Sequence, residues 1–452
     1  MILNLKGHHL EQTPARLKKL FAKYDNADHK TAVWNHFVDA PLTDVTGADC
    51  AILPRVLPAS YLPVIKKTAK DITTFALRLL SLPADEIKAI VPRGPIRDFL
   101  IEELGVLRHR NGRITGSFRF DMAIVGDPSS VNPPKLLEIN EIGFDGLARS
   151  SFIQDSMFRL IPELRSRVFA LDTASAEIRN MSRLGRKIAR IQYDSYNWDE
   201  EHLIAVGREH GVDVSLISPS QFRLHVDNDE FPLLKKTEVK SRAGRVTIDG
   251  AKPDAVQLSF AFELEDYLAG RNLYADIVRS KTPQYGPFLS GLVAAKMILV
   301  LLDDPALRKK FLGSSRKLGS AILDAFPLKG NVERTLEGFD KFVLKHTDGY
   351  GGNQVFMGRE IPRNLKKIKP RNEYEWVVQE RTNLNLLAVN GILSRPRKVI
   401  SDLGVFVHYD WSRGSFQNFE VGGFITRATN KSWRVNVSGG GIQVPVMFLK
   451  DR

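Results

Sequence analysis

The sequence predicts an α/β protein with additional α+β elements, and three observations support that class. Strand and helix patterns alternate through residues 187–258, which is typical of a parallel, Rossmann-like sheet. From residue 340 onward, short strand patterns and glycine turns dominate. The chain has 452 residues, of which 43% are hydrophobic and 26% are charged. These values are ordinary for a globular protein of two or three domains.

The first region, residues 1–170, is expected to combine helices with a β-hairpin. Residues 60–108 carry apolar side chains at helical spacing, interrupted by a Pro-Arg-Gly-Pro break. Residues 117–142 contain two strand patterns joined by the turn-rich segment GDPSSVNPP. A helical pattern beginning LARSSF follows the hairpin, so this region mixes both element types.

The second region, residues 171–285, is expected to be a Rossmann-like substrate-binding domain. Strand patterns KIARIQY, VDVSLIS and DAVQLSF frame a helical pattern that ends at Gly211. This stretch has no G-x-G-x-x-G sequence, so it does not indicate a dinucleotide site. The third region, residues 286–452, is expected to begin with helices to about residue 335 and to continue as strands.

The net charge of +13 is spread along the chain in short clusters at 16–23, 66–70, 308–318 and 364–371. One interpretation is a solvated basic surface. The other is attraction to anions such as nucleotide phosphates or an acidic substrate. The clusters are not interleaved with aromatic residues, as a surface for single-stranded nucleic acid would be. We therefore expect no nucleic-acid partner.

Three features predict a cytoplasmic protein without a membrane partner. The longest apolar run, residues 292–302, is too short to span a bilayer and contains Lys296. The first residues lack the order of charge, apolar core and small residues that marks a signal peptide. Cys50 is the single cysteine, so an intrachain disulfide and a cysteine-based metal site are both excluded.

A lysine followed by a glycine loop is the first candidate for chemistry. Lys345 ends a strand pattern, a loop with Gly349, Gly351 and Gly352 follows, and a second strand pattern begins at Gln354. A P-loop has its lysine after the glycines and leads into a helix, so that motif is excluded. A strand lysine beside a glycine hairpin suits phosphate binding through the ammonium group and main-chain N–H groups. A plain surface hairpin is the alternative.

Further pieces of the third region favour the nucleotide interpretation. The apolar strand pattern 375–382 ends in Gln379 and Glu380, as expected for a segment that binds adenine and ribose. Residues 399–410 form another predicted strand with Asp402 embedded in it. Arg427 lies on a later strand pattern, and a second glycine loop follows at 438–441.

The predicted hairpin of the first region carries a second candidate site. Residues two apart in a strand point to the same face, so Glu138 and Asn140 project together. A carboxylate and an amide carbonyl are oxygen ligands suited to Mg²⁺. Arg119 and Asp121 project together on the partner strand in the same way. An exposed polar face of the hairpin is the alternative.

These pieces resemble, in their order and across most of the chain, the eukaryotic-type glutathione synthetases, which are circularly permuted members of the ATP-grasp superfamily. Six segments carry the resemblance. They are FRFDM with LLEINEIGFDGLARSS (family FRSDY and EIN…GGLASRT), IVRSKTPQYGPFLSGLVAAKMIL (family ERS…K), VLKHTDGYGGN (family lysine strand and glycine-rich lid), VVQERT (family adenine hinge), SDLGVF (family SELGIF) and GGFITRAT…VSGGG (family GYLLRTK and covering loop).

The resemblance implies an ATP-grasp fold of glutathione-synthetase type, with a glycine-rich lid and the nucleotide site in residues 286–452. The family activates a carboxylate with ATP as an acyl phosphate, and an amine then attacks to form an amide. ATP and Mg²⁺ are therefore the expected cofactors. Small acyl and amine molecules are the expected substrates, and the family also suggests a homodimer.

The resemblance assigns roles to residues by their position in the motifs. Catalytic roles fall on Arg427, Arg119 and Lys345. Nucleotide contacts fall on Lys296, Lys345, Gly351, Gly352, Asn353, Gln379, Glu380 and Asp402. Substrate contacts fall on Arg119, Ser150, Ser151, Arg279, Arg427, Ser438 and Gly439. Metal ligands fall on Glu138, Asn140 and Asp348.

Departures from the family pattern fall on the metal and substrate positions. The family has a glutamate metal ligand where Gly349 stands, so Asp348 is the expected substitute. Thr429 stands where the family has a basic residue that contacts ATP. The loop after Asn140 is shorter, and the covering loop reads SGGG. These changes predict that ATP chemistry is kept while the joined substrates differ from γ-glutamylcysteine and glycine.

Three alternatives stay open at this point. A genuine glutathione synthetase is one, and a non-catalytic ATP-binding regulatory protein on the same scaffold is another. The third is a basic nucleic-acid-binding protein, which would bind polyanions with a steep dependence on salt concentration.

Overall fold

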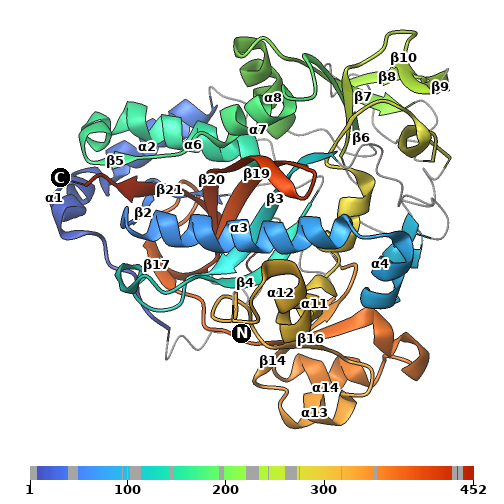
Figure 1. Cartoon of the computed structure of the whole chain (residues 1–452). Coiled ribbons are helices and arrows are strands. Elements are labelled where there is room, and N and C mark those ends of the chain that lie inside the picture. The colour runs from blue at the N-terminus through green and yellow to red at the C-terminus, as the bar shows by residue number, and fades with distance from the viewer. Residues whose placement is uncertain are drawn as a thin grey trace.

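The computed structural model describes residues 8–38, 49–93, 95–98, 100–101, 113–141, 146–192, 198–219, 234–242, 244–259, 272–273, 275–316, 318–349, 354–395, 397–429, 435 and 441–451. The strands in these residues form a large mixed sheet and two smaller sheets (Figure 1). The strands are β1 (Asp49–Cys50), β2 (Arg55–Leu57), β3 (Arg113–Ala123), β4 (Lys135–Asn140), β5 (Val168–Phe169), β6 (Lys187–Gln192), β7 (Asp213–Pro219), β8 (Leu234–Thr237), β9 (Val239–Arg242), β10 (Arg245–Ile248), β11 (Ala255–Ser259), β12 (Gln284–Tyr285), β13 (Ala325–Pro327), β14 (Phe342–His346), β15 (Val355–Met357), β16 (Trp376–Glu380), β17 (Leu386–Val389), β18 (Arg397–Ser401), β19 (Leu403–Ser412), β20 (Ser415–Thr429) and β21 (Ile442–Leu449).

Helices cover both faces of the large sheet (Figure 1). Helix α3 lies along one face, and α6, α7 and α8 form a layer on the other. The described helices are α1 (Ala15–Tyr24), α2 (Ala27–Val38), α3 (Tyr61–Leu80), α4 (Ala84–Ile90), α5 (Pro95–Asp98), α6 (Leu147–Leu160), α7 (Thr173–Met181), α8 (Trp198–Glu209), α10 (Gly291–Ala294), α11 (Ile298–Asp303), α12 (Pro305–Leu312), α13 (Val332–Glu337) and α14 (Glu360–Leu365).

The large sheet has an antiparallel half and a parallel half. In the antiparallel half, β3 pairs with β4 and β19, β19 pairs with β20, and β20 pairs with β21. In the parallel half, β12 pairs with the first part of β3, on the edge opposite β19, and β11, β6, β7 and β8 follow in that order. The predicted α/β class is confirmed, as is the parallel sheet expected from the alternation through residues 187–258.

All three regions expected from the sequence contribute to the large sheet. Strand β3 comes from residues 1–170, β6 from residues 171–285 and β19 from residues 286–452. The order β13-β16-β14-β15 forms a separate antiparallel sheet, here called the small sheet, that lies wholly within the third region. Among the residues predicted to bind the nucleotide, Lys345, Gln379 and Glu380 thus lie on the small sheet, whereas Asp402 lies between two strands of the large sheet.

One predicted strand is divided in the structure. The sequence pattern over residues 399–410 predicts a continuous strand with Asp402 inside it. Instead, β18 ends at Ser401, β19 begins at Leu403, and Asp402 belongs to neither. Strand β18 pairs with the end of β20, whereas β19 pairs along most of β20 and along β3, so the break lets the two strands take different neighbours.

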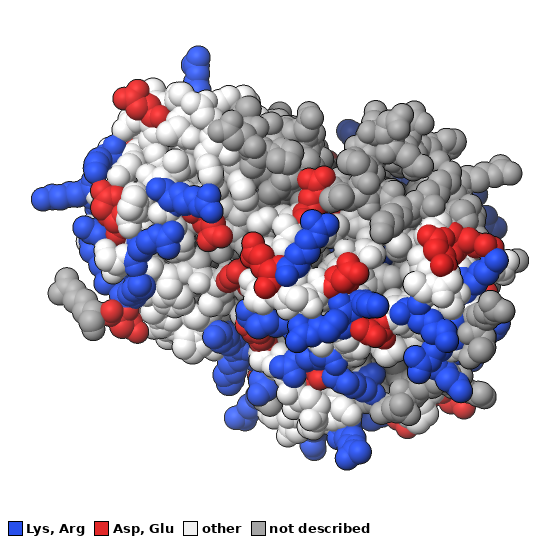
Figure 2. Space-filling model, turned by 90° about the horizontal axis from the view of Figure 1, so that it is seen from above, with Lys and Arg blue, Asp and Glu red and all other residues white. Residues whose placement is uncertain are grey.

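Lysine and arginine side chains are scattered over the surface among acidic ones. On the face drawn in Figure 2, blue basic side chains alternate with red acidic ones and crowd together most in the lower half of the view. This distribution matches the spread of basic clusters along the sequence. None of the helices among the described residues is both long and apolar enough to cross a bilayer.

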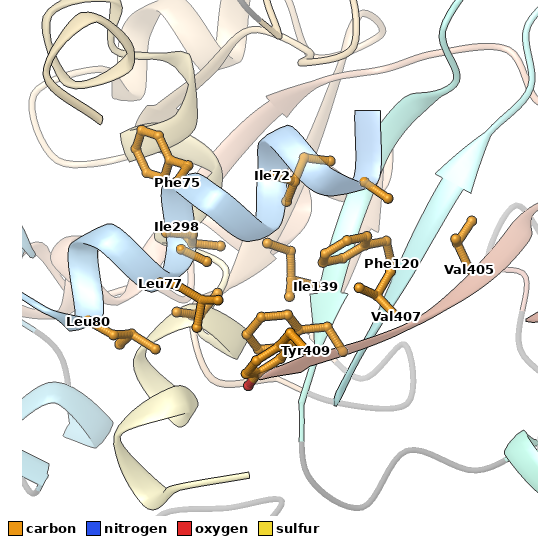
Figure 3. Close-up of a cluster of buried hydrophobic side chains, with 14 of the residues drawn as sticks. Ile72, Phe75, Leu77, Leu80, Phe120, Ile139, Ile298, Val405, Val407 and Tyr409 are labelled. Atoms are coloured by element: carbon orange, nitrogen blue, oxygen red, sulfur yellow. The ribbon is translucent and has the colours of Figure 1, made fainter. Parts of the chain in front are cut away.

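The main hydrophobic core lies between α3 and the large sheet. Apolar residues recur every three or four positions along α3, so one side of this helix is apolar throughout. Figure 3 shows Ile72 of α3 on the side of Phe120 of β3, and Leu77 of α3 on the side of Tyr409 of β19. A fully buried side chain of this size contributes about 1.5–3 kcal/mol to stability. This core fixes the position of β3 and therefore of the β3–β4 hairpin, which carries the predicted metal ligands.

Candidate active site

The hairpin β3–β4 brings a carboxylate, a guanidinium and an amide together. The register places Arg119 opposite Asn140 and Asp121 opposite Glu138, so these four side chains share one face. Arg119 Nε lies 2.9 Å from Asp121 Oδ1, and Asn140 Nδ2 lies 2.9 Å from Asp121 Oδ2. Because Asn140 donates through its nitrogen, its carbonyl oxygen is the atom directed toward other partners.

Arg427 of β20 joins the same group. Its Nη2 donates to Asp121 Oδ2 at 2.7 Å, and its Nε donates to Asp402 Oδ2 at 3.1 Å. Burial alone would raise the pKa of the Asp121 carboxyl, but the neighbouring charges of Arg119 and Arg427 hold this pKa below its ordinary value. Asp121 is therefore an ionised carboxylate shared by two arginines.

Two buried lysines lie beside the hairpin. Lys345 of β14 donates from Nζ to the main-chain oxygen of Leu137 at 2.9 Å and to Gln379 Oε1 at 2.7 Å. Lys296 Nζ lies 3.7 Å from Glu138 Oε1 and also donates to the main-chain oxygen of Gly349. Burial lowers the pKa of Lys345 to about 8; the charge of Glu138 acts in the opposite direction, and that of Lys296 adds to the lowering.

The small sheet contacts β4 through these polar side chains. Gln379 lies beside Lys345 on one face of the small sheet, because Val343 pairs with Gln379 and Lys345 is two residues further along β14. Gln379 Nε2 donates to the main-chain oxygen of Leu136 at 3.2 Å, next to the Leu137 oxygen that accepts from Lys345. The residues of the small sheet that are predicted to bind the nucleotide thus lie against β4, the strand that carries the predicted metal ligands.

The chemistry of these groups fits the phosphates of ATP. Among the described ion pairs, these two buried ammonium groups have one acidic partner, Glu138 at 3.7 Å from Lys296. Buried positive charge needs anionic partners, and phosphate oxygens are suitable ones. Lys296 and Lys345 are the residues of this chain that would hold them.

The fit to Mg²⁺ is partial. Glu138 and the carbonyl oxygen of Asn140 are two hard oxygen ligands on one face of β4. In the described part of the chain, no three His, Cys, Asp or Glu side chains gather as metal ligands. Asp348, the third predicted ligand, follows β14, and its main-chain N donates to His346 Nδ1 at 3.3 Å.

The two predicted substrate serines make bonds within the protein. Both lie on α6: the Ser150 hydroxyl donates to the main-chain oxygen of Phe424, and the Ser151 hydroxyl donates to Asp172 Oδ1 at 2.8 Å. The carboxylate of Asp199 accepts from main-chain N–H groups at the start of α6. These contacts attach α6 to β20 and to α8, and the substrate role of both serines stays a prediction.

The other predicted residues lie at the margins of this group or outside it. Arg279 is an exposed side chain in a helical segment before β12, and no hydrogen bond or ion pair joins it to the described site residues. Glu380 is exposed at the end of β16, and its main-chain N donates to the Asp324 oxygen at 2.7 Å. The remaining positions lie outside the described residues: Gly351, Gly352, Asn353, Ser438 and Gly439.

One acidic residue, Asp121, gains a place in the site that the assigned roles did not include. Asp121 connects Arg119, Asn140 and Arg427, and the sequence signals for it were its spacing of two from Arg119 and its place in the FRFDM segment. Glu141 follows β4 and is buried beside Ser290, away from this group; burial raises the pKa of Glu141 well above its ordinary value.

Comparisons with known proteins support the fold. No protein-family model matches the chain, and no curated protein matches it in sequence. The structure is similar to that of a glutathione synthetase-like effector, GSS30, from Globodera pallida, with a TM-score of 0.65, 12% sequence identity, and coverage of 88% of this chain and 90% of that chain. At this identity the likeness shows the fold, and it agrees with the glutathione-synthetase type of fold predicted from the sequence.

A second likeness is much weaker. The ATP-grasp ligase PsnB, in complex with a minimal precursor, aligns with a TM-score of 0.27 and 14% identity over 58% of this chain and 90% of that chain. A TM-score of this size supports no conclusion about the present chain.

Proposed function

We propose that this protein is an ATP-dependent ligase that joins a small anionic carboxylate to an amine and forms an amide. ATP would activate the carboxylate as an acyl phosphate and leave as ADP and phosphate. The acyl donor is expected to be an amino acid or a peptide-like molecule. The cofactors are ATP and Mg²⁺.

One observation carries this proposal: side chains from two separate sheets meet at β4. Lys345 and Gln379 of the small sheet bond to the main chain of β4, and Lys296 lies near Glu138 on that strand. Arg119 lies on the neighbouring strand. A ligase of this kind needs cations for the phosphates on one side of the metal ligands and cations for the carboxylate on the other. The arrangement of these side chains supplies both.

The proposed roles follow from this arrangement. Lys296 and Lys345 hold the phosphates, and Glu138 with the Asn140 carbonyl oxygen holds Mg²⁺. Arg119 and Arg427 both donate to Asp121, and they orient the carboxylate and stabilise the charge that develops during attack. The likeness to a glutathione synthetase-like effector is consistent with this assignment.

The first experiment is a substrate screen with purified protein. ATP and Mg²⁺ are supplied with pools of amino acids, γ-glutamyl dipeptides and small carboxylic acids, and the release of ADP and phosphate is followed. We expect release that requires one acid and one amine together. The Glu138→Gln variant, which loses a charged metal ligand, should lose this release, whereas the variant Glu163→Gln, at a half-buried residue paired with Lys23, should keep it. Release of AMP, or full activity of Glu138→Gln, would contradict the proposal.

A nucleotide-binding protein without turnover is the second candidate. It is favoured by the absence, in the described ranges, of three acidic, histidine or cysteine side chains gathered for a metal. ATP would then raise the melting temperature of the protein, as any ligand of the folded state does, while every substrate pool stayed silent. The screen together with a thermal-shift measurement separates the two candidates.

A further inference from the structure

We propose that three buried residues outside the site, Glu11, Arg55 and Asn385, position the guanidinium of Arg427. These three are called the Arg55 network below. The inference rests on the proposed ligase function, because it is the orientation of Arg427 toward the substrate that the network would control. None of the three is expected to contact ATP or substrate.

Asp402 is the link between the network and Arg427. Besides the bond from Arg427 Nε, its Oδ1 accepts from the Arg427 main-chain N at 3.1 Å, and its own N donates to the Arg427 main-chain oxygen at 3.0 Å. Asp402 lies in the break between β18 and β19, so it belongs to neither strand. Groups that fix the main chain at Asp402 therefore also fix Arg427.

Arg55 is one group that fixes this break. Its Nη1 donates to the Asp402 main-chain oxygen at 3.1 Å and to Thr426 Oγ1 at 2.8 Å, and Thr426 directly precedes Arg427. The Arg55 side chain is 2% exposed, so its charge requires a buried counterion. Glu11 is that counterion, with Oε2 2.9 Å from Arg55 Nε.

Asn385 fixes the other side of the break. Its main-chain oxygen accepts from the main-chain N of Ser401 at 3.0 Å, directly before Asp402. Its Nδ2 donates to Glu11 Oε1 at 2.8 Å and to the Gly126 main-chain oxygen at 2.7 Å. Glu11 thus contacts both residues that hold the break, and its carboxylate is the centre of the Arg55 network.

Glu11 is itself anchored through its main chain. Its N donates to the Leu386 main-chain oxygen at 3.0 Å, and the Leu386 N donates to the His9 oxygen at 2.8 Å; Leu386 is the first residue of β17. The carboxylate is therefore held at one place, and the change to glutamine removes its charge without removing these main-chain bonds. The guanidinium of Arg55 would then be left without its counterion and would shift, and the Asp402 break would shift with it.

The test compares two variants that each remove the charge from one buried ion pair. Glu11→Gln removes the counterion of Arg55. Glu200→Gln removes the counterion of Arg190, whose Nη2 lies 3.0 Å from Glu200 Oε1. The side chain of Arg190 is 11% exposed and that of Glu200 is 5% exposed. We expect Glu11→Gln to lower kcat by about tenfold or more, because a misplacement of a positioned group by about 1 Å can cost about a hundredfold. The KM for ATP should stay within about twofold, and Glu200→Gln should change neither constant.

A second measurement does not depend on activity. The side-chain Nε–H signal of Arg427, identified by its loss in Arg427→Lys, is expected to exchange slowly with solvent in the wild-type protein. It should exchange faster in Glu11→Gln, and also in Thr426→Val, which keeps the shape of the side chain but removes the acceptor for Arg55. Unchanged exchange in both variants, or equal kcat in Glu11→Gln and Glu200→Gln, would overturn the inference. If wild-type protein catalyses no ligation, the proposed function fails and the exchange rates still decide the role of the network.

Discussion

At the scale of single residues, the charge state of Lys345 links the fold to nucleotide binding. Its ammonium group is buried between two sheets, with a main-chain oxygen and an amide oxygen as partners. Both partners are uncharged, so they compensate the lost hydration only in part. This is the physical reason why the pKa of Lys345 lies at about 8.

The affinity for ATP is expected to depend on pH because of this residue. The protonated form of Lys345 attracts phosphate, and this form is lost as the pH rises through about 8. The dissociation constant for ATP should therefore rise above that pH, by at most about tenfold per pH unit, since one proton is involved. Fluorescence or calorimetric titration at several pH values measures it.

The Lys345→Arg variant is the matched control. Arginine stays charged over this pH range. The dissociation constant of the variant for ATP can differ from that of the wild type, but it should not change with pH around pH 8. A wild-type profile that is equally flat would show that the charge of Lys345 does not contribute to ATP binding.

At the scale of single elements, helix α3 determines where β3 lies. Its buried side contacts β19 and β20 as well as the α12 helix, and Phe75 forms an edge-to-face contact with Phe311 at 5.0 Å between ring centres. Such a pair adds to the contribution of the buried area. The Arg119 and Asp121 side chains project from the face of β3 opposite to this core.

Truncation of Phe75 is expected to destabilise the protein strongly. The side chain is fully buried, so Phe75→Ala leaves a cavity and should lower the free energy of unfolding by about 3–5 kcal/mol. Urea unfolding followed by circular dichroism measures the shift of the transition. The Leu393→Ala change, at a leucine that is 57% exposed, should shift it by at most about 0.5 kcal/mol. Similar shifts in the two variants would contradict the packing described for α3.

At the scale of the whole molecule, the small sheet and the large sheet share no strand ladder among the described residues. Their contact at β4 depends on the side chains of Lys345 and Gln379, each bonded to one carbonyl oxygen of that strand. The same side chains are predicted to contact the nucleotide. The position of the small sheet and the geometry of the site are therefore coupled.

Replacing Gln379 by methionine is expected to loosen the small sheet while leaving the large one unchanged. Methionine keeps the length of the side chain but loses both polar contacts. Hydrogen–deuterium exchange should therefore become faster in β14 and β16 and stay the same in β19 and β20.

Gln154→Met provides the comparison for this experiment. Gln154 is also buried and donates to a main-chain oxygen, that of Val446 at 3.2 Å, in the large sheet. In Gln154→Met, hydrogen–deuterium exchange should become faster in α6 and β21. If Gln379→Met left the hydrogen–deuterium exchange of the small sheet unchanged, the side-chain contacts of Gln379 would not be what holds the small sheet in place.

Local sequence patterns were enough to predict the class and many of the elements. The alternation in residues 187–258, the hairpin around Glu138 and the strand ending near Lys345 all depend on periodicity within one element, and the structure contains each of them. The same periodicity placed Glu138 with Asn140, and Arg119 with Asp121, on common faces. These pairs need no information beyond the spacing of two in a strand.

The tertiary structure alone decided how distant residues meet. The pairing of Arg427 with Asp121, the contact of Lys345 with β4 and the ion pair of Glu11 with Arg55 each join segments far apart in the chain. The break at Asp402 also depends on which strands lie beside it, because local propensity favours a continuous strand there. Spacing along a chain determines which side chains share a face, whereas the packing of whole elements determines which faces come together.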